Sequence, residues 1–156
     1  MEFIESSVLS DAQKLEIIAL WNNEYPESLS HKSIETFNEY LEGIANLWHI
    51  LLINSNGKIQ GWCLCFTRES ERWLTLILSS SVHGKGFGTQ LLQYAKAKEK
   101  KLNGWVIDHD KEKKKNGEPY CSPLAFYLKN GFQIVPTERL NHKISAIKIE
   151  WEKTAT

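Results

Sequence analysis

Residues 79–100 of the chain are "SSSVHGKGFGTQLLQYAKAKEK". This stretch follows the apolar run "RWLTLILS" and places glycine at 84, 86 and 88, directly before a segment whose apolar spacing predicts a helix over 88–102. Glycine permits positive φ and lacks the Cβ atom that would keep a ligand away from the backbone. Backbone N–H groups at a helix N-terminus favour an anion such as a pyrophosphate. A glycine-rich turn without a ligand is the alternative interpretation.

Two other nucleotide-binding motifs come close to this stretch without matching it. A P-loop requires G-x-x-x-x-G-K-[ST], whereas Lys85 here precedes Gly86 and no such string follows. A dinucleotide fingerprint requires G-x-G-x-x-G, but these glycines follow G-x-G-x-G and then Thr89. Asp108 does lie about 20 residues further on, where that fingerprint has an acid. A dinucleotide-binding oxidoreductase therefore stays open as the less favoured alternative.

The segments around this stretch predict one α+β domain that spans residues 1–156. The order is strand, helix, helix, three strands, helix, strand, helix and two strands, which indicates a mixed sheet rather than a doubly wound one. Asn56-Gly57 predicts the turn of a hairpin. The expected helices are residues 11–23, 33–43, 88–102 and 122–131, and the expected strands are residues 2–8, the two arms of the hairpin within 47–69, 72–79, 105–109, 132–140 and 144–151.

The composition argues against several other classes of protein. Nineteen basic residues balance nineteen acidic ones, so the chain lacks the positive charge typical of nucleic-acid-binding proteins. The N-terminus has acids where a signal peptide has a basic start, and no apolar run approaches the roughly 20 residues of a membrane span. Cys63, Cys65 and Cys121 have neither disulfide-framework nor metal-ligand spacing. We therefore expect a cytoplasmic protein without a metal, a nucleic-acid partner or a membrane partner.

Two motifs carry a resemblance to a known family. "VHGKGFGTQLL" resembles motif A of the GNAT superfamily of acyl-CoA-dependent N-acetyltransferases, Q/R-x-x-G-x-G/A, with His83 in the place of Gln or Arg. "AFYLKNGF", residues 125–132, is similar to the family's FYxKxGF motif. The resemblance implies a mixed, mostly antiparallel sheet of about seven strands flanked by about four helices. It also implies transfer of an acetyl group from acetyl-CoA to a primary amine by direct attack in a ternary complex. Pro119 departs from the family near an asparagine that touches the cofactor in many members.

The resemblance also implies where the chain holds acetyl-CoA. The 3'-phosphate and pyrophosphate would rest on the loop 83–89, and the pantetheine arm would run beside the strand 73–79. The residues implied in cofactor binding are Ile77, Leu78, Ser79, His83, Gly84, Lys85, Gly86, Phe87, Gly88 and Thr89.

The resemblance assigns the general acid to Tyr127, whose motif position matches that role. A phenol with a pKa near 10 is protonated at neutral pH and can donate to a leaving thiolate; a core aromatic is the alternative. The base is less well defined, because the strand "WLTLILSS" lacks the carboxylate that many members have there. Asp108 and His109 are candidates, since imidazole titrates near neutrality. Glu24 could act through a water.

The two segments expected around the amine acceptor give opposite indications. "WNNEYPESLSH" offers Glu24, Tyr25 and His31, which suit a cationic amine, whereas the lysine-rich "HDKEKKKNGEPYC" suits a carboxylate. The acceptor, a small-molecule or peptide amine, stays undefined. A non-catalytic acyl-CoA-binding or sensing domain is the alternative function, and a homodimer is compatible with either.

Overall fold

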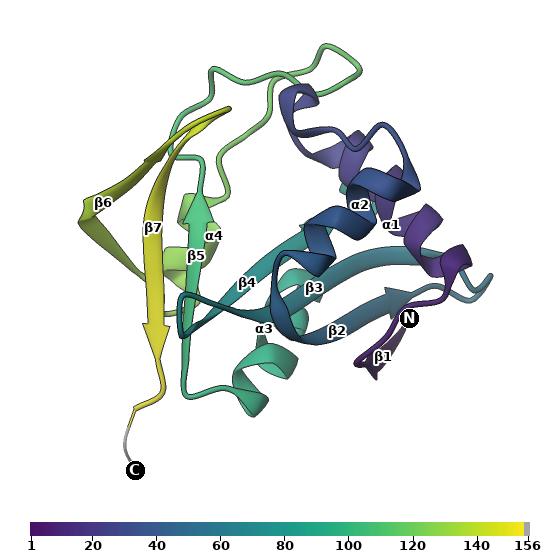
Figure 1. Ribbon diagram of the computed structural model, residues 1–156, viewed down its shortest axis with the longest axis horizontal. Helices are drawn as coiled ribbons and strands as arrows, with labels where there is room; N and C mark the ends of the chain where they lie inside the picture. The colour runs from purple at the N-terminus through teal and green to yellow at the C-terminus, as the bar shows by residue number, and fades with distance from the viewer. Residues whose placement is uncertain (155–156) are drawn as a thin grey trace.

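The computed structural model describes residues 1–154, and a seven-stranded sheet runs through the middle of the molecule (Figure 1). The strand order is β1-β2-β3-β4-β5-β7-β6, and every neighbouring pair is antiparallel except β4 and β5. This sheet confirms the predicted α+β fold. The strands are β1 (Glu2–Ser6), β2 (Ala45–Ile53), β3 (Ile59–Arg68), β4 (Glu71–Leu78), β5 (Lys101–Val106), β6 (Gln133–Asn141) and β7 (Ser145–Glu152).

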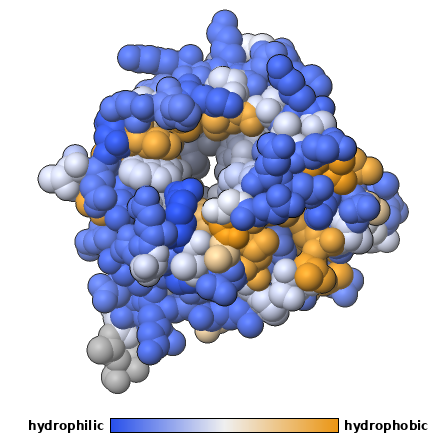
Figure 2. Space-filling model, viewed as in Figure 1, coloured by the Kyte–Doolittle hydropathy of each residue, from blue (hydrophilic) through white to orange (hydrophobic). Residues whose placement is uncertain are grey.

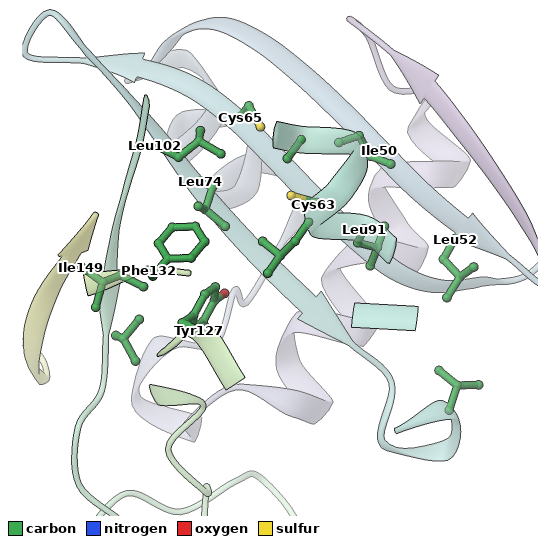
Figure 3. Packing of buried hydrophobic residues seen from close by; sticks show 14 residues of the cluster. Ile50, Leu52, Cys63, Cys65, Leu74, Leu91, Leu102, Tyr127, Phe132 and Ile149 are labelled. Carbon is green, nitrogen blue, oxygen red and sulfur yellow. The ribbon is translucent and has the colours of Figure 1, made fainter. Parts of the chain in front are cut away.

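Four α-helices cover the sheet in two pairs, and each pair encloses its own core. On one face α1 (Asp11–Glu24) and α2 (Ile34–Glu42) pack on β2–β4. On the other face α3 (Phe87–Lys98) and α4 (Leu124–Lys129) enclose a second cluster, which Figure 3 shows. Two short 3-10 helices, η1 (Glu27–Leu29) and η2 (Ser80–Val82), lie in the connections. Ser10 and Ser33 cap α1 and α2, because their side chains accept hydrogen bonds from the first turns of these helices.

The helix predicted over 88–102 ends sooner than its lysine-rich sequence indicates. α3 stops at Lys98, because Glu99 adopts an extended conformation with φ −122° and ψ 151°. Leu102, expected on the helix face, is instead fully buried in β5, opposite Trp151 of β7. The position of Leu102 fits the buried face of a helix that continues α3, and it fits equally well the buried face of a strand, in which every second side chain points the same way. Pairing with β7 decides in favour of the strand, so β5 begins four residues before the expected 105–109.

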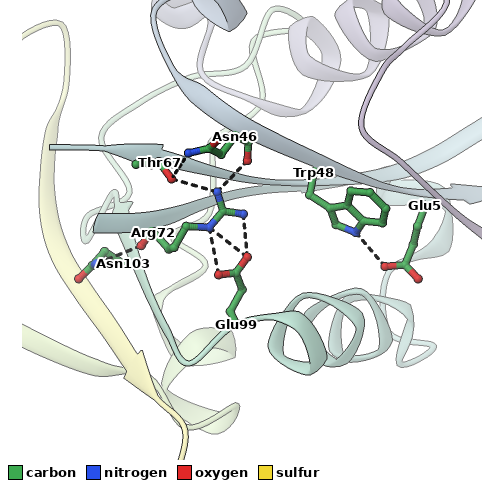
Figure 4. A network of polar contacts seen from close by, with 7 residues as sticks. All are labelled: Glu5, Asn46, Trp48, Thr67, Arg72, Glu99 and Asn103. Atoms are coloured by element: carbon green, nitrogen blue, oxygen red, sulfur yellow. Dashed lines mark hydrogen bonds and ion pairs between the residues drawn. The ribbon is translucent and has the colours of Figure 1, made fainter. Parts of the chain in front are cut away.

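β4 and β5 touch at one end and diverge at the other (Figure 1). Their parallel pairing has a single register pair, Trp73 with Asn103. At this closed end Asn103 Nδ2 donates to the Arg72 carbonyl at 3.0 Å, and the Arg72 guanidinium pairs with Glu99 at 2.7 Å (Figure 4). Beyond Trp73 this edge of β4 pairs with no strand among residues 1–154. The polar network therefore holds β4 and β5 together at one end. From there the two strands diverge as a V, and the open end of this V lies beside α3 and α4.

Within residues 1–154, no helix is long and apolar enough to cross a membrane. Over the same residues, no group of three or more His, Cys, Asp or Glu side chains is arranged to hold a metal ion.

Candidate active site

A cavity of about 620 Å³ occupies the open end of the V. Its walls come from the end of β4, the start of α3, α4, the C-terminus of α1 and the long connection between β5 and α4, residues 107–123. In the view of Figure 2 the surface is hollowed near its centre. The cavity brings together segments that are far apart in the sequence, so its chemistry depends on the fold.

The loop between β4 and α3 exposes backbone N–H groups to this cavity. Gly84 has φ 76° and Gly86 has φ 83°, and a Cβ added at either glycine would meet nothing within 4 Å. The first backbone bond inside α3 runs from Gln90 N to Gly86 O at 3.1 Å. The N–H groups of residues 87–89 therefore have no protein acceptor within the described chain. Free N–H groups, left-handed glycines and a helix N-terminus together form a site for a phosphate group.

The other residues predicted in this loop differ from one another in position. Gly88 is buried, and a Cβ on it would lie 3.1 Å from the Phe126 ring, so this glycine lets α3 pack against α4. The His83 Nε2 atom donates to the Leu78 carbonyl at 2.8 Å, which ties the loop to the end of β4. Lys85 is exposed and lies outside the residues that line the cavity. Phe87 and Thr89 do line it.

The open edge of β4 offers backbone partners for an extended chain. Ser79 N donates to Gln60 O of β3 at 2.8 Å, so Ser79 faces β3 and does not line the cavity. Because strand backbone groups alternate in direction, Leu76 and Leu78 face the gap left by β5. The N–H and C=O of Leu76 and the N–H of Leu78 are therefore available, while the Leu78 carbonyl binds His83. Sequence reasoning missed Leu76, although counting back by two from the predicted Leu78 places its backbone groups on the same edge of the strand.

Tyr127 lies on α4 and lines the cavity. The residue is 7% exposed, and its ring packs edge-on against Phe126 at 5.2 Å and Phe132 at 5.3 Å. Figure 3 shows the hydroxyl directed away from the α4 backbone. No group within residues 1–154 forms a hydrogen bond with this hydroxyl. Burial, with smaller contributions from Cys63 and Tyr120, raises the pKa of the phenol well above its usual value. The phenol is therefore protonated at any physiological pH.

The two base candidates at the end of β5 lie away from the cavity walls. Asp108 Oδ2 accepts from the Arg139 guanidinium at 2.6 Å, and this hydrogen bond holds the pKa of the carboxyl below its usual range. The His109 Nδ1 atom accepts from the Lys111 N–H at 3.1 Å. Neither side chain lines the cavity. Among the described residues, the one carboxylate that does is Glu24.

Glu24 is fixed at the C-terminus of α1 by two contacts. Its Oε2 atom accepts from Ser80 N at 3.0 Å, and its Oε1 atom faces Lys114 Nζ at 3.3 Å. Lys114 belongs to the β5–α4 connection, whose backbone is joined to the segment after α1 by a bond from Glu27 N to Lys113 O at 2.9 Å. The two segments expected around the acceptor therefore meet at this end of the cavity.

The remaining acceptor candidates separate in the structure. Tyr25 lines the cavity, and its ring lies edge-on to Tyr120 at 6.3 Å. Tyr120 lines the cavity as well and was missed, because nothing in the sequence of its loop indicated a direction for the ring. His31 lies outside the lining, with its ring 4.6 Å from Trp21 and its Nδ1 atom 3.1 Å from the Thr36 hydroxyl.

Comparison with known protein families agrees with this geometry. The model of the acetyltransferase (GNAT) domain matches residues 46–134, which is more than half of the chain and runs from β2 to the start of β6. The chain belongs to the GNAT family. It is an acyltransferase, and acetyl transfer is its general chemistry. The glycine loop and Tyr127 lie within the matched region, whereas Glu24 lies before it. No curated protein matches this GNAT chain.

Solved structures with the same fold cover nearly the whole chain. A phosphinothricin acetyltransferase from Sinorhizobium meliloti, in complex with acetyl-CoA, is 11% identical with a TM-score of 0.68, over 97% of this chain and 89% of that one. A PaiA N-acetyltransferase from Thermoplasma acidophilum, in complex with coenzyme A, is 16% identical with a TM-score of 0.62, over 98% and 100%. A ribosomal-protein-alanine N-acetyltransferase from Brucella melitensis is 13% identical with a TM-score of 0.64, over 96% and 99%. At these identities the likeness shows the fold.

Proposed function

We propose that this GNAT enzyme moves the acetyl group of acetyl-CoA directly to a primary amine, with both substrates bound at once. One observation carries the proposal: the glycine loop between β4 and α3, the open β4 edge, Tyr127 and Glu24 all line one continuous cavity. Because the acid and the carboxylate share this space with the loop, the acetyl group needs no intermediate carrier on the protein.

The residues of the cavity fit acetyl-CoA in two respects. The free N–H groups at residues 87–89 and the left-handed Gly84 and Gly86 suit a pyrophosphate, since no Cβ blocks its approach. The unpaired backbone of Leu76 and Leu78 suits the amide groups of pantetheine, which would continue the β4 edge as another strand does. Bound acetyl-CoA supplies the thioester that is consumed.

Tyr127 and Glu24 would manage the protons of the reaction. As the amine nitrogen bonds to the acetyl carbon, the carbon–sulfur bond breaks, and Tyr127 donates its phenolic proton to the departing sulfur. Glu24 would hold the arriving ammonium and take up the proton that it must lose before it attacks, and this proton passes on to solvent. The second proton leaves the nitrogen as the amide forms and restores the Tyr127 phenol, which has given its own proton to the sulfur. We favour Glu24 over Asp108 as the base, because the Asp108 carboxylate is bound to Arg139 outside the cavity.

The test is amine-dependent release of coenzyme A. The enzyme is incubated with acetyl-CoA and a panel of amines, free thiol is followed with time, and the acetylated product is identified by its mass. Initial rates at varied concentrations of both substrates should give intersecting lines, whereas parallel lines would indicate a covalent acetyl-enzyme and contradict direct transfer. Binding of acetyl-CoA with no thiol release for any amine would favour the non-catalytic sensing domain.

A further inference from the structure

The acceptor end of the cavity carries one charge of each sign. Glu24 and Lys114 both line the cavity, their side chains are 12% and 17% exposed, and they form an ion pair with each other. The cationic and anionic indications that the sequence gives for the acceptor thus come from two residues in contact. A plain amine would bind the carboxylate and leave the Lys114 ammonium without a partner, at a cost typical of breaking a buried pair. A simple carboxylic acid would leave Glu24 in the same position.

The contact between these two side chains is longer than the arginine ion pairs of the protein and similar to its lysine pairs. Glu24 and Lys114 are 3.3 Å apart, whereas the two arginine pairs are 2.7 and 2.6 Å apart and the other lysine pairs are 3.2–3.7 Å apart. Charge-assisted N–H···O bonds are usually about 2.7–2.9 Å. Lys114 also has two further N–H donors for which the described residues provide no acceptor. The pair is therefore positioned to exchange its mutual contact for a ligand that carries both charges.

The β5–α4 connection limits the size of such a ligand. Pro26 and Lys114 form an isolated antiparallel bridge, and Glu27 N donates to Lys113 O at 2.9 Å. Figure 1 shows this connection reaching across the top of the molecule to the segment after α1. These backbone contacts close the acceptor end beside Glu24 and favour a compact molecule over a peptide chain.

We propose that the amine acceptor is a free α-amino acid, whose ammonium group binds Glu24 and whose carboxylate binds Lys114. Its two charged groups are attached to the same carbon atom, which suits a carboxylate and an ammonium that lie side by side, and the aromatic rings of Tyr25 and Tyr120 leave an apolar wall for its side chain. This inference rests on the proposed acetyl transfer and names its substrate class. Lys114 then determines specificity, while Glu24 serves both binding and proton transfer.

The experiment compares α-amino acids with their carboxamides as acceptors of the acetyl group. The carboxamide keeps the ammonium group and the side chain and lacks only the carboxylate. We expect kcat/KM to favour the best amino acid over its carboxamide by roughly tenfold to a hundredfold, the range of a hydrogen bond to a charged group. The carboxamide has the more readily deprotonated amine, so chemistry alone would favour the opposite order.

The variants Lys114→Met and Lys115→Met distinguish a role of Lys114 in binding the acceptor carboxylate from a role in holding the β5–α4 connection in place. Lys115 is exposed, forms no ion pair with another residue of the part of the chain that the structure describes, and does not line the cavity, so its variant is the matched control. We expect Lys114→Met to raise KM for the amino acid and to abolish the preference over the carboxamide, while Lys115→Met keeps both. An equal loss for both acceptors in Lys114→Met would mean that Lys114 only holds the loop, and would overturn the inference.

Two further outcomes distinguish this inference from the proposed function. Acetylation of carboxamides, simple amines or peptide N-termini as efficiently as amino acids would overturn the amino-acid assignment and leave acetyl transfer intact. Thermal stabilisation by acetyl-CoA without acetylation of any amine would overturn the proposed function, and the substrate class with it.

Discussion

Replacing Tyr127 by phenylalanine should separate catalysis from stability. The substitution removes one hydroxyl and keeps the ring that packs on Phe132 at 5.3 Å. No group within residues 1–154 hydrogen-bonds this hydroxyl, so its removal leaves no protein group unpaired, and we expect the free energy of unfolding to change by less than about 1 kcal/mol. A general acid typically contributes about 10²–10⁴-fold to the rate. We therefore expect kcat to fall at least about a hundredfold, with acetyl-CoA affinity nearly unchanged.

Tyr40→Phe is the matched control for this variant. The Tyr40 hydroxyl is 3.3 Å from the Thr75 hydroxyl and lies outside the cavity lining, so its loss should cost about 1 kcal/mol of stability and leave kcat unchanged. Thiol release with saturating acceptor gives kcat, and urea unfolding gives stability. A Tyr127→Phe enzyme with wild-type kcat would refute the assignment of the acid, and so would a loss of activity fully accounted for by unfolding.

The remaining predictions concern the loop, the closed end of the V and a buried imidazole. Gly86→Ala places a Cβ at φ 83° and should weaken acetyl-CoA binding by calorimetry, whereas Gly57→Ala, at φ 76° in the hairpin turn, should only reduce stability. Arg72→Met leaves Glu99, 10% exposed, without its cation and should cost about 3 kcal/mol in urea unfolding; a change within error would contradict the network. Burial lowers the pKa of His49 to about 4. The folded state then binds fewer protons than the unfolded state between pH 6.5 and 4, so stability should decline as pH falls through that window, by up to about 1.4 kcal/mol per pH unit. An NMR titration in which the His49 ring protonates near pH 6.5 would contradict this.

Local sequence signals predicted the elements and the order in which they occur. The predicted helices 11–23 and 33–43 begin where Ser10 and Ser33 cap α1 and α2, because a capping hydroxyl acts on N–H groups only two or three residues away. Gly84 and Gly86 marked the loop, because positive φ is a local property of the backbone. The end of α3 was mispredicted, because the burial of Leu102 depends on a partner strand almost fifty residues later.

The arrangement of the site depends on contacts that no local pattern encodes. Glu24 and Lys114 are 90 residues apart, and only the docking of the β5–α4 connection brings them to 3.3 Å. Asp108 was a reasonable base candidate from the sequence, but its carboxylate is bound by Arg139 of β6, which is 31 residues later in the chain. The availability of the Leu76 backbone follows from the divergence of β5, which leaves no trace in the residues of β4 itself.

Thermal unfolding with acetyl-CoA, coenzyme A or NAD in large excess most directly tests whether the glycine loop and the β4 edge form a coenzyme A site. A ligand at 100 times its Kd that binds only the folded state adds about 2.7 kcal/mol, which corresponds to a rise in Tm of roughly 5–10 °C for a chain of this size. We expect this rise with acetyl-CoA and coenzyme A and none with NAD, and we expect Gly86→Ala to reduce it. A rise with NAD alone, or none with acetyl-CoA, would contradict the assignment of the cavity.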